Sequence, residues 1–83
     1  MIYKFDAENV TRSLAIKLVR ELEAKGVVVE YANVGQVFSN EMVMIVTCNE
    51  EMAKQIRDDI WKVNHGLFCD MSTITQDQLD SYL

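Results

Sequence analysis

The 83-residue chain is 49% hydrophobic and 25% charged, which is typical of one folded domain, residues 1–83, with a modest core. Thirteen acids against eight bases give a net charge of −5, which opposes direct binding to nucleic acid. The longest uncharged apolar run, Met42 to Cys48, is too short to span a membrane, and the N-terminus lacks a signal-peptide pattern, so we expect a cytoplasmic protein.

The first quarter of the chain reads as a strand followed by a helix. Ile2 to Phe5 predicts the strand. Residues 7–25 carry apolar side chains at helical spacing, so we expect a helix there, with Asp6 as its N-cap and Gly26 as its C-terminal stop.

Two strands are predicted next, and a hairpin is their simplest connection. The first covers 27–31 and the second covers 42–48, because both are rich in β-branched and other apolar residues. Gly35 between them indicates a bulge in a longer first arm that continues to Phe38.

The second half of the chain repeats the helix-and-strand order. Asn49 is the predicted N-cap of a helix over 50–64, and the segment 67–74 after it predicts the last strand. Thr75 and Gln78 form a capping-box pattern, which indicates a short C-terminal helix.

This order of elements resembles the ferredoxin-like split βαβ fold of the α+β class. The resemblance implies a four-stranded antiparallel sheet with two helices on one face, the strands lying in the order fourth, first, third, second. Many functions share this fold, so it implies none of them.

Acidic residues gather in two segments that contain no base, 26–53 and 63–83. In the expected fold these segments meet at one end of the molecule, where a negative surface would attract a basic partner. The alternative is a solvated surface that serves solubility. The candidate binding residues at this end are Glu30, Glu50, Glu51, Asp77 and Asp80.

Two apolar residues lie off the buried stripes of the predicted helices. Ile16 falls on the polar side of the first helix, and Trp61 falls off the stripe of the second. Trp61 suits either the edge of the core or a binding hot spot. With Ile16 it would form a binding patch if the helices lie side by side.

No motif for catalysis or for a cofactor is present. Cys48, His65 and Cys69 are residue types that bind zinc, but the expected fold places Cys48 at one end of the sheet and the other two at the opposite end. The single histidine has no nucleophile and acid at a recognisable spacing. We therefore expect no metal and no cofactor.

Three functions remain open. The first is a non-catalytic protein-binding module, a small acidic inhibitor or regulator that docks on a basic, nucleic-acid-binding surface of a partner; its composition is similar to that of inhibitors encoded by phages and other mobile elements. The second is a ligand-sensing regulatory domain that acts as a homodimer. The third, for which the sequence offers least, is a small enzyme.

Overall fold

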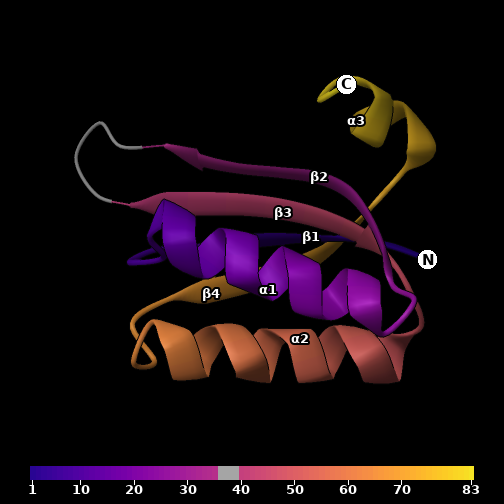
Figure 1. The fold of residues 1–83 in the computed structure, drawn as a ribbon. Coiled ribbons are helices and arrows are strands. Elements are labelled where there is room, and N and C mark those ends of the chain that lie inside the picture. Colours follow the sequence, from indigo (N-terminus) through magenta and orange to yellow (C-terminus); the bar gives the residue numbers. More distant parts are fainter. Residues whose placement is uncertain (36–39) are drawn as a thin grey trace.

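The structure is a computed structural model that describes residues 1–35 and 40–83 (Figure 1). Its elements are β1 (Ile2–Ala7), α1 (Arg12–Ala24), β2 (Val28–Gly35), β3 (Glu41–Thr47), α2 (Glu50–Val63), β4 (Cys69–Ile74) and α3 (Gln76–Asp80).

The four strands form one antiparallel sheet in the order β2-β3-β1-β4. Helices α1 and α2 lie side by side on one face of it (Figure 1). The α+β fold, the strand order and the short C-terminal helix that the sequence predicts are therefore confirmed.

The main core fills the space between the sheet and these two helices. Alternate residues of β1 and β3 point into it because successive side chains of a strand face opposite sides. The largest of its fully buried side chains are Phe5, Leu22, Met42, Met44, Ile56 and Ile60.

The predicted start of the first helix is wrong. β1 continues to Ala7, which pairs with Met42 on one side and with Cys69 on the other, so Asp6 is a strand residue and not an N-cap. The helix begins at Arg12. Its N-cap is Thr11, whose hydroxyl accepts a hydrogen bond from the Leu14 N–H at 3.3 Å.

The predicted bulge at Gly35 is also wrong, because Gly35 pairs regularly with Glu41. The register of β2 against β3 shifts instead between Val29 and Tyr31, so Glu30 is the extra residue. The predicted continuation to Phe38 lies outside the described residues.

The predicted caps of the later helices are confirmed. The side-chain oxygen of Asn49 accepts a hydrogen bond from the Met52 N–H at 2.8 Å. At α3, Thr75 and Gln78 form the reciprocal capping box.

Helix α3 lies over the face of the sheet opposite to α1 and α2 (Figure 1). Ile45 and Leu79 are buried but stand outside the main core cluster. Tyr82 contacts Tyr31 with 5.2 Å between ring centroids, and its hydroxyl lies 3.3 Å from the Lys4 ammonium. Because Tyr31 and Lys4 are the register neighbours of Ile45, α3 covers this half of the second face.

One buried amide joins three parts of the fold. Asn64, the C-cap of α2, is fully buried, and its Nδ2 donates to the carbonyl oxygens of Glu8 at 3.1 Å and Phe68 at 2.6 Å. The end of α2 is therefore bonded to the segment that follows β1 and to the segment that precedes β4.

Replacing this amide should destabilise the protein. Asn64→Ala removes the side-chain donor to both carbonyls, and we expect a loss of about 1–3 kcal/mol in the free energy of unfolding, measured by urea denaturation. Asn33→Ala, at an exposed position of β2, is the control and should change stability by less than about 0.5 kcal/mol. Equal losses of stability in Asn64→Ala and Asn33→Ala would contradict this role of the Asn64 amide.

The cover formed by α3 should also be measurable. Leu79→Ala removes a side chain that is 2% exposed, so we expect a loss of about 2 kcal/mol or more on thermal or urea unfolding. Asp77→Ala, in the same helix but exposed, should cost less than about 1 kcal/mol. Equal losses of stability in Leu79→Ala and Asp77→Ala would instead show that α3 is only loosely attached to the sheet.

Candidate protein-interaction site

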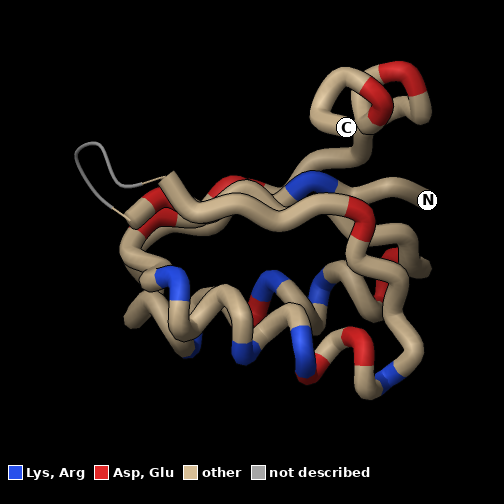
Figure 2. The backbone as a smooth tube through the Cα atoms, turned by 45° about the horizontal axis from the view of Figure 1, so that its top comes forward, with Lys and Arg blue, Asp and Glu red and all other residues tan. Residues whose placement is uncertain are grey.

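Charge is divided between the two layers of the molecule. The two long helices, with the cap residue Lys25, carry seven bases and six acids, whereas the remainder of the chain carries seven acids and a single base, Lys4. The helix layer is therefore close to neutral. The whole net negative charge belongs to the sheet, its connections and α3 (Figure 2).

An acidic pocket of about 200 Å³ lies where β1 ends and β3 begins. The acidic residues Asp6, Glu8 and Glu41 line it together with Phe68, which is 46% exposed, and the Asp6 carboxylate also pairs with the Lys4 ammonium at 3.5 Å. Asp70 lies next to it, as the register partner of Asp6 on β4. The pocket thus combines several negative groups with an accessible aromatic ring.

Hydrogen bonds hold the walls of this pocket. The Asn64 amide binds the carbonyls of Glu8 and Phe68, and the Glu8 N–H donates to the Phe68 carbonyl at 3.4 Å. The Val10 N–H donates to the Asn40 carbonyl at 3.1 Å, which joins the segment after β1 to the start of β3. The buried amide therefore holds the segments of Glu8 and Phe68, and the Val10–Asn40 bond holds the start of β3 beside them.

The sequence does not predict this pocket, because Asp6 resembles a helix N-cap in its local context. In β1, the buried residues Tyr3, Phe5 and Ala7 alternate with Lys4 and Asp6. This alternation is the pattern that indicates a strand continuing through Asp6. It extends β1 by two residues and turns Asp6 toward the face opposite the long helices.

The acidic residues predicted to meet at one end are divided between the two faces of the sheet. Glu50 and Glu51 begin α2 on one face, whereas Asp77 and Asp80 belong to α3 on the other (Figures 1 and 2). Glu30 lies on β2, where its Oε1 accepts a hydrogen bond from the Thr47 hydroxyl at 3.1 Å. The start of β2, the end of β3 before α2 and the end of β4 before α3 nevertheless share one end of the sheet, as the sequence predicts, with the sheet between the two acidic pairs.

Trp61 is 42% exposed. Its ring packs against the side chain of Arg57, which lies one turn earlier in α2. The guanidinium carbon of Arg57 lies 5.2 Å from the centroid of the indole. Trp61 is therefore partly covered, at the edge of the helix layer.

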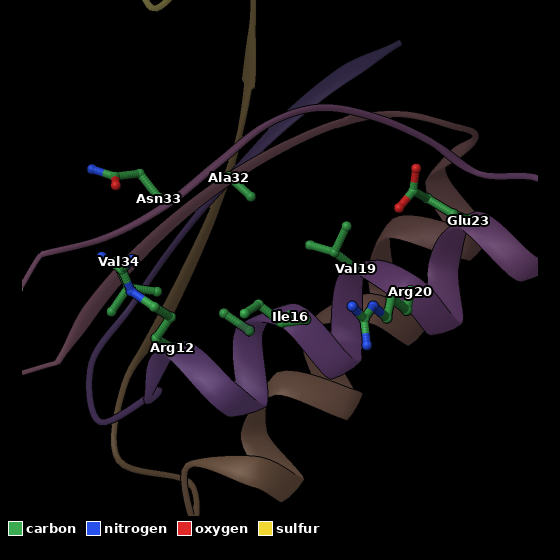
Figure 3. A pocket seen from close by; sticks show the side chains of 9 residues that line it. Arg12, Ile16, Val19, Arg20, Glu23, Ala32, Asn33 and Val34 are labelled. Carbon is green, nitrogen blue, oxygen red and sulfur yellow. The ribbon is translucent and has the colours of Figure 1, made fainter.

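Ile16 is 45% exposed and lines a groove between α1 and the edge strand β2 (Figure 3). The residues of α2 that face α1 across a different hollow are Asp59, Lys62 and Val63. Trp61 is not among them, so the structure does not join Ile16 and Trp61 into the patch that the sequence suggested.

The candidate zinc ligands lie apart. Cys48 follows the end of β3, whereas His65 and Cys69 lie at the opposite end of the sheet, before and at the start of β4. Among residues 1–35 and 40–83, no group of three His, Cys, Asp or Glu side chains is arranged to hold a metal ion.

Neither thiol is activated. Burial raises the pKa of Cys69 to about 11, and burial also raises the pKa of Cys48 above its ordinary value. Both cysteines are free and protonated at neutral pH, which is the state of packing residues.

No family model, curated protein or solved structure matches this chain. None of the helices within the described ranges is long and apolar enough to cross a membrane. A function therefore has to be argued from the surface itself.

The raised pKa of Cys69 gives a direct test of its burial. In the Cys48→Ser variant at pH 8, we expect Cys69 to react with a thiol reagent at least about tenfold more slowly in the folded protein than in urea, because little thiolate is present. The absorbance of the released reagent measures the rate. Equal rates in the two states would show that the thiol is exposed.

Proposed function

We propose that this protein is a non-catalytic binding module that docks its acidic sheet face on a basic surface of a partner protein. The separation of charge between the two layers is the observation that carries the proposal. A field of one sign on one face orients an incoming partner of the opposite sign and speeds its association.

The acidic pocket supplies the chemistry for this docking. A lysine or arginine side chain would enter between the carboxylates of Asp6, Glu8 and Glu41 and would lie against the ring of Phe68. Ion pairing and the cation–π attraction then act on the same group. Binding of this kind requires no nucleophile and no metal.

An acidic face of this kind would compete with nucleic acid for a basic site. The partner that we propose is accordingly a nucleic-acid-handling protein, and the effect of binding is inhibition or regulation. The small size and the acidity support this role, which is also that of inhibitors carried by phages and other mobile elements.

The proposal predicts that partner capture depends on the acidic pocket and not on acidity in general. The double variant Glu8→Gln, Glu41→Gln should lose most of a partner captured from lysate of the source organism at low salt. Its matched control, Glu50→Gln with Glu51→Gln, removes two charges from the helix layer and should retain the partner. Mass spectrometry of the bound fraction measures both, and circular dichroism checks that each variant folds.

The dependence of partner capture on salt concentration is a second test of the same proposal. Capture by the native protein should fall as ionic strength rises, because the exposed charges are screened. If both double variants retain the partner equally, docking does not use the pocket. If only the Glu50 and Glu51 variant loses it, the start of α2 is the docking site instead.

A further inference from the structure

The groove between α1 and β2 lies beside the helix layer, which carries little net charge. It has a volume of about 370 Å³, and its wall on the helix side includes Ile16 and Val19 (Figure 3). Ala32 and Val34 of β2 form the apolar part of the other wall. The groove is therefore an apolar surface that α1 and a sheet edge share.

One stripe of α1 along this groove is symmetric about its own midpoint. Its members are Arg12, Ile16, Val19 and Glu23, spaced by four, three and four residues. This spacing keeps them on one side of the helix. Reversing the direction of the helix exchanges Arg12 with Glu23 and Ile16 with Val19.

A surface with this symmetry is complementary to a second copy of itself. When two α1 helices pack antiparallel about a two-fold axis, Ile16 of each copy meets Val19 of the other at the centre. Arg12 of each copy then meets Glu23 of the other at both ends. Two-fold dimers require such self-complementary contacts.

The charges at the ends of the stripe are available for these contacts. Within residues 1–35 and 40–83, neither Arg12 nor Glu23 makes an ion pair, although other charged residues of the same layer do. Both side chains are exposed. Each would gain a partner of opposite sign only when a second copy is present.

The part of β2 beyond the bulge is a sheet edge without charge or proline. β2 is the outermost strand on its side of the sheet, and its segment 31–35, beyond the bulge, contains no charged residue and no proline. Charge and proline are devices that keep edge strands from pairing with other chains. A dimer about the α1 stripe would bring the two β2 edges together and cover both.

We propose that two copies of this chain associate about a two-fold axis through the α1 stripe and the β2 edge. The acidic sheet faces stay outside this interface, so the dimer carries two of them. Association is independent of the basic partner proposed above, and it is measured on the purified protein alone.

Charge reversal tests the pairing of Arg12 with Glu23. Sedimentation equilibrium of the native chain should give a mass twice its 9.5 kDa as concentration rises. Arg12→Glu alone or Glu23→Arg alone places like charges together at both ends, and each should weaken the dimer by about tenfold or more. The double variant with both changes restores opposite charges and should recover the native affinity.

Mixing the two single variants is a further test. Arg12→Glu chains and Glu23→Arg chains should pair with each other better than either variant pairs with itself. Lys17→Glu, which faces α2 on the same helix, is the matched control and should leave the dimer unchanged. A chain that stays monomeric at millimolar concentration, or a dimer that none of the stripe variants weakens, would overturn the proposal.

Discussion

The structure depends on one buried amide. Asn64 is the only fully buried polar residue among those described, and its Nδ2 bonds the carbonyls of both Glu8 and Phe68. Burial of a polar group is costly unless hydrogen bonds compensate. The Asn64 Nδ2 makes two such bonds, whereas its Oδ1 has no partner among the described residues, so the Nδ2 contacts specify how three segments meet. It fixes the end of α2 against the segments that adjoin β1 and β4. Glu8 and Phe68, which line the acidic pocket, lie on those same segments.

The acidic sheet face and the nearly neutral helix layer follow from the division of charge between the two layers. The sheet side, with nearly all of its ionisable groups acidic, suits a partner rich in bases. The helix layer mixes both signs, so it can approach another copy of itself without the repulsion that a net charge of −5 would otherwise cause. The two proposed interfaces therefore lie on different parts of the domain.

Much of the fold was predictable, because in most elements the local sequence pattern and the tertiary contacts favour the same secondary structure. The cap at Asn49, the capping box at Thr75 and the alternation in β3 each identify their element without reference to the rest. The start of α1 was not predictable in this way. Asp6 resembles an N-cap locally, but pairing on both sides makes its segment a strand, and that pairing is a property of the whole sheet.

The candidate site was less predictable than the fold. Its acidic groups come from β1, the segment after β1 and β3, its aromatic ring comes from the segment before β4, and no spacing in the sequence brings such residues together. No pattern in the sequence predicts that α3 crosses to the second face, since Tyr31 and Tyr82 are 51 residues apart and meet only through the tertiary fold. The bulge in β2 makes that meeting feasible. Because Glu30 is the extra residue, Tyr31 and Ile45 share one face while Val34 keeps its place above α1. Position 30 is therefore the place in this strand where evolution can remove a residue without turning the side chains that follow to the wrong face.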